Sequence, residues 1–316
     1  MNLQTKIPLQ PQPHNQIDYN SNLLLLGSCF VENIGKKLDY FKFQNFQNPL
    51  GILFQPLAIE KLITNAVNKR EYTEDDIFFH NEQWHCFDAH SKVSSNSKNE
   101  LLNLLNSQID LTAQQLHKST HIIITLGTAW VYRHIETDSI VANCHKVPQK
   151  KFLKELLLVD EIAESLESII ALIRSVNKEA SILFTVSPVR HLKDGFIENT
   201  QSKAHLISAI HQVVESRKNF HYFSSYEIMM DELRDYRFYS EDMIHPNQTA
   251  INCVWEKFQN VWISKDASQT MKVVEEIQRG INHKPFNPNS EAHQNFLKKL
   301  NEKKEGLQKK YAHIVF

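Results

Sequence analysis

The chain has 316 residues, with 35 Lys and Arg, 36 Asp and Glu, and a formal net charge of -1. This length allows one large α/β domain with appendages, or at most two domains, and it excludes a small disulfide-stapled fold. The balanced charge gives no electrostatic reason to expect a nucleic acid or an anionic membrane surface as partner.

The N-terminal twenty residues are polar and rich in Pro and Gln, with no basic segment leading into a long apolar core. The apolar run that follows, at 23–26, is too short to direct export or to span a membrane. The four cysteines are widely spaced and form no CxxC pair, which favours neither a zinc knuckle nor a disulfide framework. We therefore expect a cytoplasmic protein in a reducing compartment, with no metal and no cofactor.

Short apolar runs bounded by polar or turn residues recur along the chain, at 23–26, 122–126, 182–186 and, more weakly, 220–223. Such runs are typical of strands buried on both faces of a parallel sheet. Apolar residues at helical spacing lie between them, over 30–41, 153–173 and 206–213. The alternation predicts an α/β fold with helices on both sheet faces and a ligand site at the carboxyl ends of the strands, where Gly27, Gly127 and Pro188 fall.

Two segments depart from this alternation. Residues 70–100 are rich in polar and aromatic residues and contain a Ser/Asn-rich tract at 94–99, which indicates an insertion such as a small hairpin carrying a loop. Residues 266–316 hold nine Lys and Arg against six Asp and Glu and are interrupted by Pro285 and Pro288. We expect a main domain over 1–265 and a charged helical extension over 266–316, either packed on the core or exposed for a partner.

The turn after the first predicted strand, Gly27-Ser28-Cys29, carries two possible nucleophiles. Unpaired N–H groups and the helix dipole stabilise an oxyanion at such a turn, and they make a thiol easier to ionise. Each residue also has a purely structural interpretation. Ser28 is a favoured helix N-cap, and a free cysteine such as Cys29 is commonly a small buried apolar residue.

A carboxylate and an imidazole, Asp242 and His245, lie three positions apart before a segment with helical spacing at 247–262. On a loop, the aspartate can accept the imidazole Nδ1–H and leave Nε2 facing a nucleophile. Alternatively, Asp242 and Asn247 are turn and cap residues and His245 is a surface histidine. No third ligand at suitable spacing favours a metal.

Taken together, Gly27-Ser28-Cys29-Phe30 resembles the signature of the GSCFA domain family, a distant branch of the SGNH (GDSL-like) hydrolases. The resemblance runs from about residue 21 to 262, with further matching motifs at 48–52, 126–132, 143–148 and 186–190 and around Asp242 and His245. It implies a three-layer α/β/α, flavodoxin-like fold with a parallel central sheet. It also implies acyl-ester chemistry through a covalent acyl-enzyme.

The chain departs from the wider SGNH pattern at the nucleophile and at the oxyanion donor. An ungapped match places Cys29 under the nucleophilic serine of that family, whereas a one-residue shift restores Ser28. The stretch beginning Gly127-Thr128 lacks the asparagine that normally donates to the oxyanion. The Thr128 hydroxyl, Asn48 or a backbone N–H near Gly51 would have to replace it.

Two further residues, His145 and Arg190, are candidates for the substrate rim. His145 is alternatively a structural histidine. Arg190 either clamps a carboxylate or phosphate of the substrate or forms an ion pair on the surface.

These observations predict an acyl-ester hydrolase in which Cys29 or Ser28 attacks a carbonyl, His245 is the base and Asp242 orients it. The expected substrate is a small-molecule or carbohydrate acyl ester, and a homo-oligomer is compatible with the sequence. Two alternatives remain open. One is a cysteine-dependent acyltransferase with an acyl-thioester donor, and the other is a non-catalytic binding module on the same fold.

Overall fold

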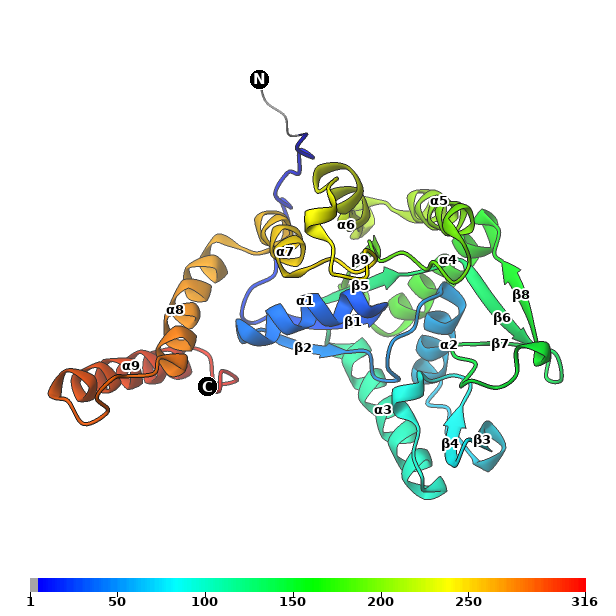
Figure 1. Cartoon of the computed structure of the whole chain (residues 1–316), viewed down its shortest axis with the longest axis horizontal. Coiled ribbons are helices and arrows are strands. Elements are labelled where there is room, and N and C mark those ends of the chain that lie inside the picture. The colour runs from blue at the N-terminus through cyan, green and yellow to red at the C-terminus, as the bar shows by residue number, and fades with distance from the viewer. Residues whose placement is uncertain (1–4) are drawn as a thin grey trace.

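The structure, a computed structural model, describes residues 5–316 except for the side chain of Ser216. Its centre is a five-stranded parallel sheet in the order β10-β9-β5-β1-β2 (Figure 1). The strands are β1 Asn22–Gly27, β2 Gln44–Gln47, β5 His121–Leu126, β9 Ser181–Val186 and β10 Phe220–Phe223. The apolar runs predicted as strands are confirmed as β1, β5, β9 and β10.

Read in chain order, the five strands lie 2-1-3-4-5 across the sheet, which is the flavodoxin-like order. The direction of winding changes between β1 and β5, and ligands bind at such a switch point, outside the carboxyl ends of the strands. Gly27 ends β1 there, and Gly127 directly follows β5. The sheet therefore brings the two predicted glycine turns side by side.

Helices cover both faces of the sheet, so the predicted three-layer α/β/α fold is confirmed (Figure 1). Alternate residues of β1 enter different layers, because successive strand side chains point to opposite faces: Leu24 and Leu26 pack with α2 to α5, and Leu23 and Leu25 with α1 and α7. The helices are α1 Cys29–Tyr40, α2 Pro56–Val67, α3 Lys98–Lys118, α4 Val159–Val176, α5 Phe196–Val213, α6 Ser225–Glu227, α7 Gln248–Trp262, α8 Lys265–Asn282 and α9 Glu291–Lys310.

One helix boundary predicted from spacing is wrong. The apolar residues at 153–157 belong not to the helix but to strand β8, Phe152–Leu156, and its loop, and α4 begins only at Val159. β8 pairs antiparallel with β6 Trp130–His134, which also pairs with β7 Ser139–Val141, in a separate small sheet. Leu153 is half exposed on this sheet, so its apolar character does not report burial in a helix.

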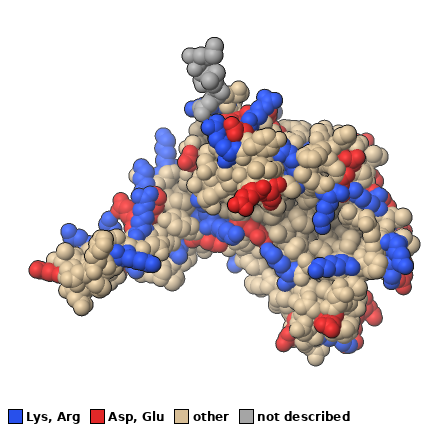
Figure 2. All heavy atoms as spheres, viewed as in Figure 1, with Lys and Arg blue, Asp and Glu red and all other residues tan. Residues whose placement is uncertain are grey.

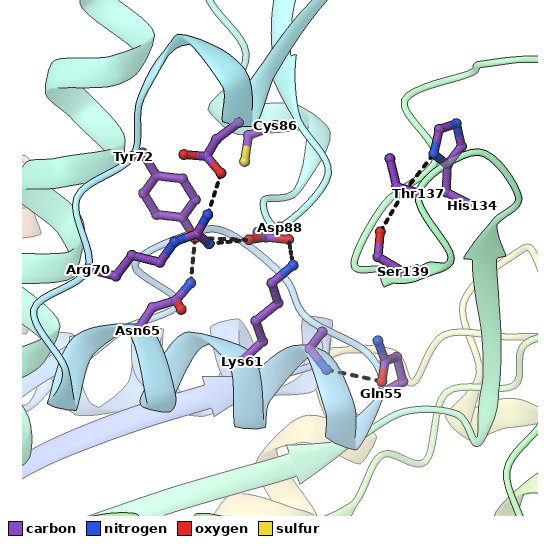
Figure 3. Close-up of polar contacts among 12 residues, drawn as sticks. Gln55, Lys61, Asn65, Arg70, Tyr72, Cys86, Asp88, His134, Thr137 and Ser139 are labelled. Atoms are coloured by element: carbon purple, nitrogen blue, oxygen red, sulfur yellow. Dashed lines mark hydrogen bonds and ion pairs between the residues drawn. The ribbon is translucent and has the colours of Figure 1, made fainter.

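The segment 70–100 forms a hairpin, β3 Ile77–His80 and β4 Gln83–Cys86, that a polar network fastens to α2 (Figure 3). Lys61 on α2 pairs with Asp88 at 2.6 Å, and the Tyr72 hydroxyl donates to the same carboxylate at 3.3 Å. The Asn65 amide in turn donates to the Tyr72 hydroxyl at 3.1 Å. These contacts hold the hairpin against the helix that follows the β2 turn.

The C-terminal helices α8 and α9 extend from the domain as an arm, with Lys and Arg side chains along it (Figures 1 and 2). Buried residues of the arm, among them Val274, Leu300 and Ile314, nevertheless belong to the same apolar cluster as α1 and α7. Within residues 5–316, no helix is long and apolar enough to cross a bilayer.

Candidate active site

The β1–α1 turn has a conformation that requires glycine at its first position. Gly27 has a φ of 130°, and a Cβ there would overlap the backbone carbonyl of Thr125 on the neighbouring strand. The N–H of Ser28 donates to the Thr125 carbonyl at 3.0 Å, which ties the turn to β5. The turn is therefore fixed against the switch point of the sheet.

Ser28 acts as the N-cap of α1. Its Oγ accepts the N–H of Phe30 at 3.4 Å, and the residue is completely buried. A hydroxyl enclosed in this way has no access to a substrate carbonyl without movement of the turn. The cap interpretation of Ser28 therefore fits the geometry better than the nucleophile interpretation.

Cys29 is the first residue of α1 and is partly exposed. Burial and the nearby Glu32 carboxylate raise the pKa of its thiol, while the Lys203 ammonium and the N–H groups of Cys29 and Phe30 lower it, and the net effect is a raised pKa. The predicted easier ionisation of Cys29 is thus wrong. The helix N-terminus acts in the expected direction, but desolvation of the thiolate outweighs it.

Asp242 and His245 form the predicted hydrogen bond on the loop between β10 and α7. The imidazole Nδ1 lies 2.6 Å from Asp242 Oδ2, and Oδ1 accepts the N–H groups of Ile244 and His245 at 2.9 Å each. These two backbone donors, followed by the imidazole, lower the pKa of Asp242 to about 2. The carboxylate is therefore ionised at neutral pH and holds Nδ1 protonated, which leaves Nε2 as the acceptor.

No hydrogen bond joins His245 to Ser28 or Cys29 among the residues that the structure describes. A different imidazole, His191, adjoins the nucleophile turn. Its Nε2 lies 3.1 Å from the position that a Cβ on Gly127 would take, and the Ser28 Cβ lies 3.3 Å from that same position. The structure thus places His191 against the turn where the sequence led us to expect His245.

His191 follows β9 on a loop, and its Nε2 is buried without a hydrogen-bond partner among the described residues. Burial lowers its pKa to about 3, helped by the charges of Lys203 and His245. Its ring forms a T-shaped contact with Phe54, with ring centroids 5.2 Å apart. No sequence pattern marks His191, because its position depends on a loop that packs back over β5.

The candidate oxyanion donors differ in availability. The Gly51 N–H donates to the Asn48 carbonyl at 2.8 Å, and the Gly127 N–H to the Phe54 carbonyl at 2.7 Å. The Thr128 hydroxyl accepts the Trp130 N–H at 3.0 Å and lies 3.1 Å from the Ser202 hydroxyl. The Gly51 and Gly127 N–H groups are therefore engaged in backbone hydrogen bonds and are not available to an oxyanion. Between Thr128 and Ser202 either hydroxyl can be the donor.

Asn48 has a donor to spare. Its Oδ1 accepts the N–H of Gly27 at 2.9 Å, whereas its Nδ2 is buried with no partner in the described part of the chain. The Gly27 N–H fixes which atom of the amide is the oxygen, because a donor must face an acceptor. Of the two side chains predicted for this role, Asn48 is the one whose donor nitrogen is buried without a partner among the described residues.

His145 packs on the β3–β4 hairpin and forms no hydrogen bond with the nucleophile turn among the described residues. Its Nε2 lies 2.7 Å from the Cys86 carbonyl, and its ring packs against His85 and Phe78 of the β3–β4 hairpin. Burial lowers its pKa to about 4. The structural interpretation of His145 is the one that the contacts support.

Arg190 lies beside the loop that carries His245. It donates to the Tyr239 hydroxyl at 2.7 Å and to Met230 Sδ at 3.2 Å, and no carboxylate of the described residues lies within ion-pair distance of it. The alternative of a surface ion pair is therefore wrong for Arg190.

A second cation, Lys203 on α5, is buried beneath the site. The sequence gives a weak indication of this burial, since Lys203, Leu206 and Ile210 share one helix face. A single lysine in such a pattern usually lies at the edge of the apolar face, so its burial was not predicted. No group of three or more His, Cys, Asp or Glu suited to a metal occurs in the described part of the chain.

Comparison with known protein families matches residues 22–258 to the GSCFA family. The chain belongs to the GSCFA family. Residues 274–316 match the C-terminal domain of GSCFA domain proteins, so the GSCFA assignment also covers the second half of α8 and all of α9. No curated protein matches the chain significantly. The first match spans every residue of the site described above, from Gly27 to His245.

Proposed function

We propose that this GSCFA protein is an acyl-ester hydrolase of SGNH type, with Cys29 as nucleophile and His245 as general base. The observation that carries the proposal is the 2.6 Å contact between Asp242 and His245 Nδ1, which leaves Nε2 as a proton acceptor at the carboxyl edge of the sheet. The partly exposed Cys29 thiol begins α1 at that same edge, whereas Ser28 is enclosed.

In the proposed reaction, Cys29 Sγ attacks the ester carbonyl carbon while His245 Nε2 takes the thiol proton. The C–O bond to the alcohol then breaks, the alcohol leaves with that proton, and water hydrolyses the thioester with His245 again as base. The Cys29 N–H group and the spare Asn48 Nδ2–H groups are the proposed donors to the oxyanion, since the Phe30 N–H already caps α1 through Ser28 Oγ.

The raised pKa of Cys29 supports general-base catalysis in place of a preformed thiolate. A thiol that is protonated at neutral pH needs a base at the moment of attack, which is the role assigned to His245. Catalytic hydrogen bonds are often long without substrate and tighten in the complex, so the missing contact between His245 and Cys29 is compatible with this role.

Two rival functions use the same geometry. An acyltransferase would form the same thioester but pass the acyl group to an acceptor other than water. A non-catalytic binding module is favoured by the absence of a hydrogen bond between His245 and Cys29 and by the enclosed Ser28.

Hydrolysis of p-nitrophenyl acetate by the wild type, Cys29→Ala and Cys144→Ala separates these functions. Cys144 is a matched control, because it is also a partly exposed free cysteine but lies outside the nucleophile turn. We expect Cys29→Ala to lose activity and Cys144→Ala to keep it. A single burst of p-nitrophenol that becomes continuous release when an alcohol or amine is added would favour the acyltransferase. No release of p-nitrophenol at all would favour the binding module.

A further inference from the structure

Lys203 is a buried cation without an acidic partner. It is 1% exposed, and its Nζ donates to the carbonyls of Gly127 at 2.6 Å and Ser187 at 2.8 Å. No carboxylate of the described residues lies within ion-pair distance of it. An ammonium group has three N–H donors, so two carbonyls leave one donor over. Burial accordingly lowers the pKa of Lys203 to about 7.

Arg190 brings a second unpaired cation to the same place. It follows Ser187 by three residues, and its charge lowers the pKa of Lys203 further. It donates to the Tyr239 hydroxyl and Met230 Sδ and lies over the Tyr239 ring, 5.2 Å from its centroid, so several of its five N–H donors remain available. The ammonium form of Lys203 and the Arg190 guanidinium repel each other, so keeping Lys203 charged costs free energy in the absence of an anion.

Several other partly buried cations of this chain have acidic partners, although Lys37 donates to the amide oxygen of Asn252 and forms no ion pair among the described residues. Lys61 pairs with Asp88 at 2.6 Å, and Lys257 pairs with Glu232 at 2.7 Å. Arg174 also donates only to carbonyls, but one of these belongs to the cap of α4, where a helix C-terminus favours a cation. Among the described residues, Arg190 and Lys203 form neither an ion pair with a carboxylate nor a hydrogen bond to the cap of a helix C-terminus.

The acidic groups around the site are turned to other partners. Asp242 accepts the His245 Nδ1–H and two backbone N–H groups, and the Glu32 carboxylate lies 3.5 Å from Lys92 Nζ. The Cys29 thiol lies close enough to Lys203 for each group to shift the pKa of the other. The unpaired positive charge therefore adjoins the reacting atom of the proposed mechanism.

We propose that Arg190 and Lys203 form an anion subsite beside the nucleophile turn, so that the ligand of this site carries a carboxylate or a phosphate group. Arg190 contacts the anion through its remaining N–H groups, which match the oxygens of either group in a fork geometry. The buried Lys203 ammonium, held at the Gly127 and Ser187 carbonyls, adds a second positive charge that attracts the anion. This assignment rests on the proposed function only in naming the anionic ligand as the substrate.

The test measures binding by calorimetry with three probes: succinate, inorganic phosphate and the neutral analogue succinamide. We expect the wild type to bind succinate or phosphate at least tenfold more tightly than succinamide, and the tighter of the two anions identifies the group. Arg190→Gln removes a charge-assisted contact and should weaken that anion by roughly tenfold to a hundredfold. Equal affinity for all three probes, or no binding of either anion, would overturn the subsite.

Two control variants test whether Arg190 contacts the anion or only supports the loop that carries His245. Tyr239→Phe removes the hydroxyl that Arg190 contacts but leaves the guanidinium, and Arg237→Gln removes an exposed arginine of the same loop that pairs with Asp235. Both should bind the anion within about twofold of wild type. If Tyr239→Phe weakens anion binding as much as Arg190→Gln does, Arg190 only supports the loop and the proposed subsite is wrong.

The outcome is independent of turnover. If the anions bind but no ester is hydrolysed, the subsite stands and the hydrolase proposal fails. If neutral esters are hydrolysed while no anion binds, the reverse holds.

Discussion

The side-chain carbonyl of Asn48 accepts the backbone N–H of Gly27 at 2.9 Å, which joins the turn after β2 to the turn that carries the nucleophile. The same amide keeps Nδ2 buried and unpaired within the described residues. An unpaired buried donor costs free energy, and in the proposed mechanism this donor binds the oxyanion.

Asn48→Asp tests this role with little change of shape. The carboxylate still accepts the Gly27 N–H but offers no donor, so we expect kcat for p-nitrophenyl acetate to fall by roughly 10² to 10³ while KM changes little. Thermal unfolding checks that the fold is retained. A folded Asn48→Asp protein with wild-type kcat would show that the oxyanion donor lies elsewhere.

Asp242→Asn tests the orientation of His245. The amide cannot hold Nδ1 protonated as the carboxylate does, so we expect kcat to fall by roughly 10⁴, as in triads of this kind. Asp235→Asn is the control, because Asp235 is an exposed carboxylate of the same connection that accepts the Arg237 N–H. Equal activity of Asp242→Asn and Asp235→Asn would remove His245 from the mechanism.

Gly27→Ala tests the strained turn. A Cβ would overlap the Thr125 carbonyl, and the φ of 130° is unfavourable for any other residue, so we expect a loss of roughly 2 to 4 kcal/mol in the free energy of unfolding. Gly306→Ala is the control, since Gly306 lies within α9 with no described atom near a new Cβ. Urea unfolding should show Gly306→Ala to be more stable than wild type by about 0.5 to 1 kcal/mol. Similar effects of the two substitutions would contradict the described turn.

Glu32→Gln tests the electrostatics of Cys29 through pH. The Glu32 carboxylate raises the pKa of the thiol by disfavouring the thiolate, so its removal should lower that pKa. We expect the rate of iodoacetamide alkylation of Cys29, followed by peptide mass spectrometry against pH, to rise at lower pH in the variant than in the wild type. An unchanged or alkaline-shifted profile would show that Glu32 does not act on the thiol.

The buried strands were predictable from sequence because each carries an uninterrupted apolar run, as in Leu23 to Leu26. β2 was not, since Gln44–Gln47 is a polar edge strand that gives no such run. The prediction of a helix that includes Leu153 is wrong because the apolar residues of β8 and of α4 together follow a single helical spacing in the sequence. The local sequence pattern therefore identifies the buried strands of the central sheet but not its polar edge strand, β2.

At the site, the sequence identified the groups that lie close together along the chain. The hydrogen bond between Asp242 and His245 follows from a three-residue spacing. His191, on the β9–α5 connection, and Lys203, on α5, meet Gly127 only through tertiary packing, which no local sequence pattern shows. The pKa of Cys29 was predicted in the wrong direction for the same reason, because burial is set by tertiary contacts.

The most direct test of the account is to trap the acyl-enzyme with p-nitrophenyl acetate and map the acylated residue by peptide mass spectrometry, in the wild type and in His245→Ala. The account predicts an acetyl group on Cys29 in the wild type and at least a hundredfold slower acetylation in His245→Ala, since general-base catalysis contributes about 10² to 10⁴. Acetylation of Ser28, or of Cys29 at the same rate in both proteins, would contradict it.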